Sequence, residues 1–521
     1  DALLRDLRRA VLARPGLQGL EILAVRYEMG PNARRHNAPG QPSMACYNQV
    51  EANRNIPSRL LRLSDFGNPA PTVATLLDSP DATLSCVDLH WGADKVCYVR
   101  KDPADGGRLK LWELRLDGSE PRPLSPAKAD FDVGDGCWLP DGRLLVTATA
   151  AEQGLPCESG RLAMTNTYRL DPKTGKLDRL TFDQDSNWSP TVMEDGQVMY
   201  VRWEYCDLAH FFSRNVMTMR PDGTRQLAYY GSNGFWPNHY GDPKPIPGQP
   251  GRFVCVATGH HAPKSGRLAL FDVSKGRAEK AGAVQMIPGF GKPIPERVED
   301  YLYAGDWPRF LSPFPLAPGP GRGDAGKFFL VSMRPSKDDL WGIYLVDVFD
   351  NLIPLAQIEG AALCEPIRVE RRPVPPVLPD LVRPGARTCT VHVADIYNGP
   401  GLAGVPRGAV KALRVFAYHY AYNKVGSHEG VGTESSWDMK YLLGTVPVNP
   451  DGSVFFTAPA HIPLSLQPLD ARGQALQLMR SWLVGQPGEH VSCTGCHESA
   501  NSIYDVPPLP GAPAALTPPD S

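Results

Sequence analysis

Short runs in which apolar and polar side chains alternate recur along the first two thirds of the chain, and they have the length and composition of β-strands. Their first residues lie roughly 50 to 75 residues apart, a spacing typical of repeated four-stranded units. Most runs precede a second strand-like run that ends in a polar turn, such as Asp117-Gly118 or Asp222-Gly223, and these turns are typical of β-hairpins. The six runs are Glu21–Arg26, Lys95–Arg100, Arg143–Ala148, Gln197–Arg202, Arg252–Ala257 and Lys327–Ser332.

The repeat predicts an all-β chain that begins with a six-bladed β-propeller over residues 1–372, in which the two longest spacings contain loop insertions. An irregular pair of β-sandwiches is the alternative for the same pattern. Little of the chain has the period of an amphipathic helix, and Ala2–Ala13 is the best candidate for one.

The repeat stops near Arg371, where a Pro-rich stretch over residues 373–386 predicts a semi-rigid linker. Further strand-like runs beyond it predict a β-rich, sandwich-like middle domain over residues 387–504, whose last part contains Cys493, Cys496 and His497. Residues 505–521 are again Pro-rich and predict an extended tail.

The composition excludes several classes of partner. The 521 residues include 54 Lys and Arg against 56 Asp and Glu, a formal charge of −2, whereas nucleic-acid binding and adhesion to acidic membranes need a basic excess. No apolar run approaches the length of about 18 residues that would predict a helical membrane span. The chain begins at Asp1 with no Met and no charged-then-apolar leader, as expected of a mature or trimmed product.

The strongest chemical signal is Cys493-Thr-Gly-Cys496-His497, the C-x-x-C-H pattern of covalent c-type haem attachment. Two thioethers anchor the porphyrin, and the histidine that follows is placed to ligate the iron. A zinc site would need a second pair of ligands, and a thioredoxin-type redox pair would need a βαβ context; the sequence has neither a second C-x-x-C nor that context. Because haem c is attached in an oxidising compartment, the motif predicts a periplasmic or otherwise exported protein with one covalent haem c.

The second axial ligand of that haem would decide its chemistry, because two strong ligands favour electron transfer and an open site lets small molecules bind. The chain has 12 His and 11 Met, and Tyr504, seven residues after His497, is a further candidate iron ligand. The other nine cysteines are odd in number, so intrachain disulfides cannot include them all.

Two other segments offer metal ligands at strand ends. His260 and His261 follow an apolar strand, and Asp207 lies beside Cys206 and His210 in a loop after another strand. In isolation, both segments also fit ordinary polar turns. The G-x-G-x-x-G match at 321–326 precedes a strand and predicts a loop, and the absence of Walker, H-E-x-x-H and G-x-S-x-G motifs leaves hydrolase and nucleotide-binding functions without support.

Four segments of the chain carry a family resemblance, namely residues 203–238, 257–261, 405–423 and 444–498. They resemble the hydrazine synthase alpha subunit family. The resemblance implies a six-bladed propeller followed by a middle domain that carries a c-type haem.

The resemblance also implies an unusual haem site. In that family the histidine of C-x-x-C-H binds zinc together with an Asp and a His of the propeller, a nearby Tyr ligates the iron, and a further Cys bonds the porphyrin. It implies that Cys493 and Cys496 hold the haem, and that His497 is an iron or zinc ligand. The implied candidates for the other roles are His260 or His261 for the propeller His, Asp132, Asp135 or Asp207 for the Asp, and Cys157, Cys206 or Cys255 for the extra thioether.

The sequence departs from the family at two places. The family's tyrosine lies four residues after the motif histidine, where this chain has Asn501, and Tyr504 is the nearest Tyr. Only residues 498–521 follow the motif, so a C-terminal second-haem domain is not expected in this chain, and hydrazine synthesis by the chain alone is not expected either.

These observations predict an exported mono-haem c-type cytochrome with a redox role at a haem between propeller and middle domain. That role is either small nitrogen-compound chemistry, as an oxidoreductase, or electron transfer to a redox partner protein. The alternative is a propeller scaffold or subunit of a larger redox complex, with a structural or electron-wiring haem. A solitary electron carrier is a third hypothesis.

Overall fold

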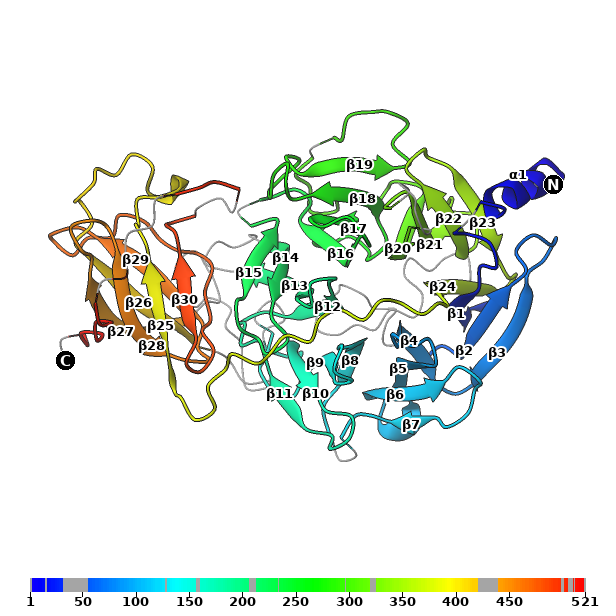
Figure 1. The fold of residues 1–521 in the computed structure, drawn as a ribbon, viewed down its shortest axis with the longest axis horizontal. Coiled ribbons are helices and arrows are strands. Elements are labelled where there is room, and N and C mark those ends of the chain that lie inside the picture. The colour runs from blue at the N-terminus through cyan, green and yellow to red at the C-terminus, as the bar shows by residue number, and fades with distance from the viewer. Residues whose placement is uncertain are drawn as a thin grey trace.

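The computed structural model describes residues 2–14, 16–30, 55–126, 129–155, 160–205, 212–232, 234–295, 297–318, 325–419, 439–497, 501–504, 509 and 511–519. The chain is all-β, as predicted, and its strands form two bodies (Figure 1). The larger body is a ring of propeller-like blades, and the smaller contains two sheets. Among the described residues, no helix is long and apolar enough to cross a membrane.

In the part of the chain that the structure describes, the ring consists of six antiparallel groups of four strands (Figure 1). Two neighbouring groups are joined into one sheet by a single parallel pairing, Arg214 with His239. The first three groups, each written from its innermost strand outwards, are β24 (Ala361–Arg368), β1 (Ile22–Glu28), β2 (Ser58–Ser64) and β3 (Thr72–Ser79); β4 (Thr83–Leu89), β5 (Lys95–Lys101), β6 (Leu109–Arg115) and β7 (Arg122–Pro123); β8 (Val133–Trp138), β9 (Leu144–Ala148), β10 (Asn166–Leu170) and β11 (Leu177–Arg179). The other three are β12 (Asn187–Val192), β13 (Val198–Tyr205), β14 (Phe212–Met219) and β15 (Leu227–Tyr230); β16 (His239–Pro245), β17 (Arg252–Thr258), β18 (Arg267–Asp272) and β19 (Ala283–Ile287); β20 (Arg309–Pro315), β21 (Phe328–Arg334), β22 (Gly342–Asp347) and β23 (Leu352–Ala356).

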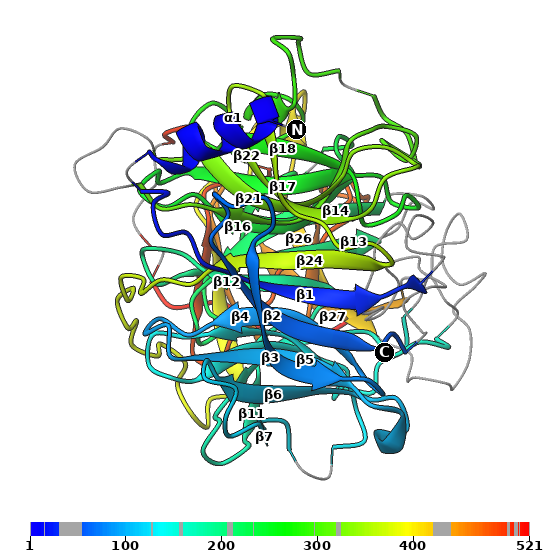
Figure 2. The same cartoon turned by 90° about the vertical axis from the view of Figure 1, so that its right-hand side faces the viewer.

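The helix α1 (Ala2–Leu12) forms where the sequence predicted one, and it lies on the outer rim of the ring near β22 (Figure 2). Its Val11 is buried in a core cluster with Leu345 of β22, so the helix covers an apolar edge of that blade. Two short 3-10 helices complete the helical content of the described residues, η3 (Pro103–Asp105) and η5 (Pro400–Leu402).

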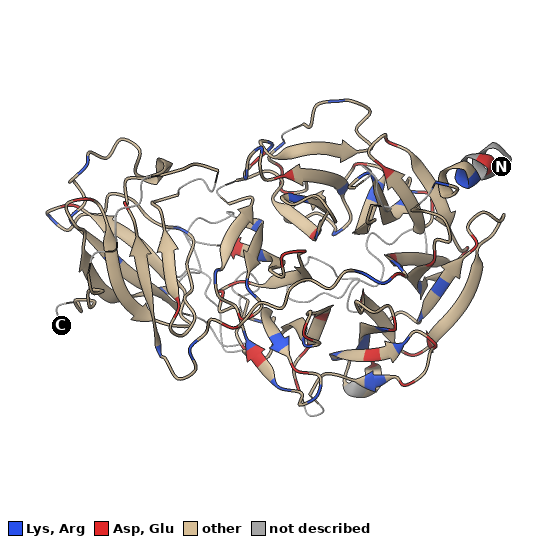
Figure 3. Cartoon of the chain, in the orientation of Figure 1, with Lys and Arg blue, Asp and Glu red and all other residues tan. Residues whose placement is uncertain are grey.

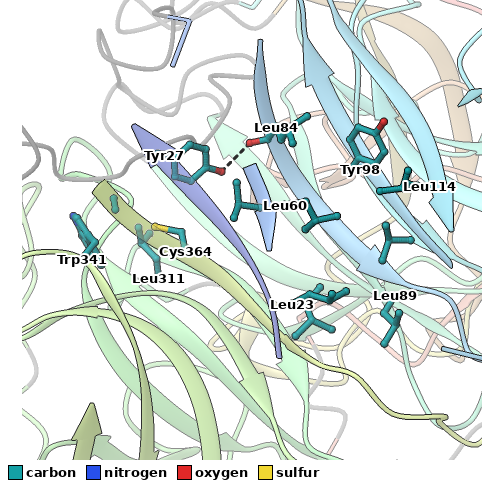
Figure 4. Packing of buried hydrophobic residues seen from close by; sticks show 14 of the residues in the cluster. Leu23, Tyr27, Leu60, Leu84, Leu89, Tyr98, Leu114, Leu311, Trp341 and Cys364 are labelled. Carbon is teal, nitrogen blue, oxygen red and sulfur yellow. Dashed lines mark hydrogen bonds between the residues drawn. The ribbon is translucent and has the colours of Figure 1, made fainter. Parts of the chain in front are cut away.

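The ring is closed by the two ends of the propeller-like body. The N-terminal strand β1 pairs on one side with β2 and on the other with β24, nearly 340 residues later in the chain. The Tyr27 hydroxyl of β1 lies 2.9 Å from the Leu84 carbonyl oxygen of the next blade, and Figure 4 shows this bond within the buried core. The same hydroxyl lies 3.0 Å from Glu365 Oε1 of β24, and Glu365 Oε2 accepts a bond from Val87 N at 3.0 Å. Strand pairing and side-chain bonds therefore connect three segments at the closure.

All six innermost strands contain the same irregularity. Each has a register shift at its middle, and one residue there lies in the left-handed region of φ, as in a β-bulge. In four of the six strands the next residue is proline. The six bulge residues are Cys86, Asp135, Ser189, Asp242, Ser312 and Glu365.

The smaller body contains two three-stranded sheets whose inner faces share one apolar core, with Val391 and Val415 at its centre. The first sheet has the order β28 (Val454–Pro459), β25 (Thr388–Val393), β30 (His490–Cys493), and the second β27 (Met439–Pro447), β26 (Ala412–His419), β29 (Leu464–Leu469). Acidic and basic residues are interspersed along the described parts of the chain (Figure 3).

The segment from Val369 to Arg387 crosses the ring and leads to β25 (Figure 1). The Arg372 guanidinium lies 4.6 Å from the centre of the Trp91 ring, and the Asp380 carboxylate accepts two bonds from Arg169, at 2.7 and 3.0 Å. These contacts fix the Pro-rich segment, hereafter the strap, against the blades.

Substitution of Glu365 by Gln tests the electrostatics of the closure. Burial raises the pKa of Glu365 to about 7, above the value near 4.3 expected in an unfolded chain. Between these two values the folded protein binds more protons than the unfolded chain, so this carboxyl lowers the free energy of unfolding as pH rises. We expect the wild type to lose about 3 kcal/mol from this source between about pH 4 and pH 8, and Glu365→Gln to lose less, in urea denaturation across that range. Glu120→Gln, at an exposed turn, should retain the wild-type slope. Equal slopes for wild type and Glu365→Gln would contradict this account.

Candidate functional site

The C-x-x-C-H segment lies at the edge of the smaller body. Cys493 is the last residue of β30, which pairs in parallel with β25, and its carbonyl accepts a bond from Ala394 N at 2.9 Å. Three residues later, the Cys496 carbonyl accepts a bond from Gly401 N at 3.0 Å. The backbone at both cysteines is therefore fixed to one neighbouring segment, 394–401.

Two glycines make this close packing possible. A Cβ on Gly495 would lie 2.3 Å from the Asn398 carbonyl oxygen, and one on Gly401 would lie 2.7 Å from the Cys496 carbonyl oxygen. Both distances are too short for real atoms, so larger residues would displace the segment. The two cysteines are half-buried, whereas His497 is exposed and has φ of +59°.

The residues after the motif contact the ring. Asn501 Nδ2 donates to the Val273 carbonyl at 2.8 Å, and its Oδ1 accepts from Arg277 Nε at 3.0 Å. Tyr504, the candidate iron ligand, is half-buried three residues later. The motif is thus followed at once by a contact with the turn after β18.

The His260–His261 loop connects β17 to β18. Gly259 allows its close approach to the segment after residue 299, because a Cβ there would lie 2.3 Å from the Asp300 carbonyl oxygen. His261 Nδ1 lies 2.6 Å from Asp300 Oδ2, while the other oxygen, Oδ1, has no hydrogen-bond partner among the described residues. A carboxylate at Nδ1 fixes the ring and directs Nε2 away from it.

The neighbouring His260 has a different environment. It is buried, with 1% of its surface exposed, and its ring lies 5.3 Å from that of Trp203 and 5.6 Å from that of Tyr205. Its carbonyl accepts a bond from Arg214 Nη1 at 3.1 Å. Of the two histidines, His261 is therefore the more accessible.

The motif and the histidine loop are connected to opposite ends of β18. The loop ends where β18 begins, whereas Asn501 contacts Val273 beyond its last residue, and the six residues of the strand span about 20 Å. Within the described residues, no three His, Cys, Asp or Glu side chains are grouped closely enough to hold a metal ion. Asp207, the third predicted zinc ligand, lies outside the described residues.

The remaining sequence candidates are dispersed. Asp132 Oδ1 accepts a bond from Leu109 N at 2.9 Å, and Asp135 is a bulge residue of β8. Cys255 is fully buried in an apolar core, and burial raises the pKa of its thiol well above the usual range. Cys157 and Cys206 lie outside the described residues.

Two residues that sequence reasoning missed, Asp183 and Trp482, form a contact between the two bodies. Trp482 Nε1 donates to Asp183 Oδ1 at 2.6 Å, and the Arg202 guanidinium lies 5.1 Å from the centre of the Trp482 ring. Asp183 is completely buried, and Trp482 is 2% exposed. The two bodies are therefore joined by a buried hydrogen bond. Separation of the bodies would leave the Asp183 carboxylate without this donor, so the bond constrains their relative position.

Comparisons with known proteins agree with this architecture. Residues 408–498 match the family model of the hydrazine synthase alpha subunit middle domain. Hydrazine synthase from Kuenenia stuttgartiensis has the same fold, with a TM-score of 0.70 at 16% identity over 94% of this chain and 71% of that chain. A nidogen/laminin complex (TM-score 0.40, 9% identity, 67% of this chain and 99% of that chain) and TolB from Acinetobacter baumannii (0.38, 13%, 71% and 71%) are more distantly similar. No curated protein sequence matches the chain.

Substitution of Trp482 by Phe tests the contact between the bodies. It removes the indole donor from the buried Asp183 carboxylate, and we expect the free energy of unfolding to fall by about 1 to 3 kcal/mol, measured by chemical denaturation. Trp138→Phe is the matched control, because Trp138 is equally buried and its Nε1 has no hydrogen-bond partner among the described residues. An equal loss in both variants would show that ring size, rather than the bond to Asp183, determines the effect.

Proposed function

Since this chain is related to the hydrazine synthase alpha subunit through its middle domain, we propose that it is an exported c-type cytochrome with a redox role at one covalent haem. The observation that carries the proposal is the C-x-x-C-H sequence inside the segment that matches the family model. The proposed organisation is a six-bladed β-propeller (1–372), a linker (373–386), a middle domain (387–504) and a tail (505–521).

The residues at the motif fit a covalently attached haem. Cys493 and Cys496 are partly exposed at the edge of the smaller body, and their backbone is fixed by the 394–401 segment. His497 is exposed directly after them, and Tyr504 follows within the same segment. Two partly exposed thiols, the imidazole of the next residue and a phenol seven residues further along the sequence are groups that can bind a haem and its iron.

Haem bound here would supply an iron that exchanges single electrons or binds small molecules such as nitric oxide. In this proposal Cys493 and Cys496 anchor the porphyrin, and Tyr504 or His497 ligates the iron. The contact of Asn501 with Val273 and Arg277 places the end of this segment beside the ring. That contact supports a haem between the two bodies, with small nitrogen compounds as the proposed substrates and a redox protein as the proposed electron partner.

A zinc ion is the second proposed cofactor, with a propeller histidine as its ligand and His497 as the alternative, since the segment after the motif and the histidine loop contact opposite ends of β18. The contacts favour His261 over His260, because Asp300 orients His261 in the manner of carboxylate–histidine–metal sites while His260 is buried. Asp207 remains the proposed acidic ligand.

The second candidate function is that of a scaffold or subunit in a larger redox complex. The matched family model describes a subunit, and propeller-like rings commonly present docking faces. In that case the haem has a structural or electron-wiring role.

Absorption spectra of the oxidised and reduced protein, with and without nitric oxide, separate the two functions. A high-spin spectrum that shifts when nitric oxide is added supports a catalytic role. A low-spin spectrum that does not shift supports a structural or electron-transfer role for the haem.

Removal of both motif thiols tests haem attachment. When the chain is expressed with the c-type maturation machinery in the periplasm, we expect one covalent haem per chain, measured by pyridine haemochrome and by haem staining of denaturing gels. The Cys493→Ser/Cys496→Ser variant should lose covalent haem, because no thioether can form. Cys389→Ser is the control, since Cys389 is 1% exposed in the core of the same body and should leave haem content unchanged. Covalent haem in the double variant, or none in the wild type, would refute the proposal.

His261→Ala tests the zinc site. Removal of a ligand should lower zinc affinity by tenfold or more, and Asp300→Asn should weaken it by a smaller factor, both measured by elemental analysis after dialysis against a competing chelator. His90→Ala is matched, because His90 Nδ1 also lies 2.8 Å from a carboxylate, that of Asp94. Unchanged zinc in His261→Ala and reduced zinc in His90→Ala would locate the metal elsewhere.

A further inference from the structure

A cavity of about 380 Å³ lies at the centre of the ring. All six bulge residues line it, together with Lys264 from the loop that also carries His260 and His261. Part of the strap, Pro373–Pro376, lines it as well. Asp135 is one of the three sequence candidates for the zinc-binding Asp, but the cavity lining includes neither the C-x-x-C-H segment nor His260 or His261.

Hydrogen bonds fix the acidic groups in this cavity. Asp135 Oδ2 accepts from Ser189 N at 3.2 Å, and Ser189 Oγ donates to Asp242 Oδ1 at 3.0 Å. The Cys86 thiol donates to Asp135 Oδ1 at 3.3 Å. Glu365 is held by its bonds with Tyr27 and Val87. The β-bulge thus places three carboxyl groups, those of Asp135, Asp242 and Glu365, from three different blades at one cavity. A ligand would therefore meet a preorganised set of acceptors.

The charge of the lining selects for a cation. Six acidic residues line the cavity against three basic ones, and of the latter Lys264 interacts electrostatically with Asp135, Asp242 and Glu365. One ammonium group is thus already present among three carboxyl groups. The excess of acceptors attracts a second cation and repels anions, and burial strengthens both effects.

The spacing of the groups selects among cations. No three metal-ligating side chains within the described residues are close enough to hold a metal ion, which disfavours a bare divalent cation. An ammonium group donates N–H bonds of ordinary length to carboxylates and hydroxyls. Its oxygen partners can therefore lie further apart than the oxygen ligands of a metal ion. The rest of the lining includes Val87, Phe314 and Ile367, which offer apolar surface to a carbon chain. The volume falls in the range of small-molecule sites.

We propose that the central cavity binds a small organic ammonium ion, with its nitrogen among Asp135, Asp242 and Glu365 and its carbon chain against the apolar lining. Ser312 faces the same space on an equivalent bulge but carries no charge. The site is independent of haem attachment, so it should be present whether or not the proposed function is correct.

Isothermal titration of the full chain with n-butylammonium chloride, n-butanol and calcium chloride tests the proposal. We expect n-butylammonium to bind one per chain and n-butanol, its neutral counterpart, to bind at least about tenfold more weakly, as for loss of a charged hydrogen bond. Equal affinity for n-butanol would show that the cavity binds only the carbon chain, which would contradict the proposal. Absence of n-butylammonium binding, or its displacement by stoichiometric calcium, would also overturn the proposal.

Variants locate the site within the ring. Asp242→Asn should weaken n-butylammonium binding about tenfold while it retains an acceptor for Ser189, and Lys264→Met should strengthen binding by removal of the competing ammonium. Ser312→Ala is the matched control and should change affinity by less than about twofold. Circular dichroism would verify folding, and the three wild-type titrations decide the question if a variant does not fold. Equal affinities for Asp242→Asn and Ser312→Ala would place the ligand elsewhere and refute the proposal.

Discussion

The pairing of β1 with β24 is the constraint on which the rest of the structure depends. Three strands of one blade come from the start of the ring and its innermost strand comes from the end, so the blade exists only when the two pair. Glu365 strengthens this closure through its contacts with Tyr27 and Val87, at the cost of a buried carboxyl group. Because β24 runs directly into the strap, the closure also determines where the chain leaves the ring.

The position of the smaller body follows from that exit point. The strap is fixed to the blades by Arg372 and Asp380, and the buried bond between Trp482 and Asp183 adds a second attachment. Cys493 and Cys496 are therefore carried by a body that is constrained at two places relative to the ring. Asn501 adds a third contact immediately after the motif. This arrangement suits a group held between the two bodies, since neither body can move independently without loss of buried polar contacts.

The sequence was informative where a pattern is local. The six apolar runs found by alternation correspond to β1, β5, β9, β13, β17 and β21, the second strand of each blade. These strands are regular and buried, so their composition is distinctive. The innermost strands were not predicted, because each bulge interrupts the two-residue alternation. A bulge residue followed by proline, as in Ser189-Pro190 and Asp242-Pro243, recurs in four of these strands and could have identified them. The C-x-x-C-H segment was recognisable for the same reason of locality. Contacts between distant positions, such as His261 with Asp300 and Trp482 with Asp183, leave no local pattern and needed the fold.

The repeated bulge has a consequence for how such rings can diverge. A bulge residue lies outside the regular ladder of its strand, so its side chain can change without a change in strand pairing. The six blades already carry Cys, Asp, Ser, Asp, Ser and Glu at this position. Substitution of these residues can therefore change the chemistry of the centre one blade at a time, while the scaffold that surrounds it stays the same.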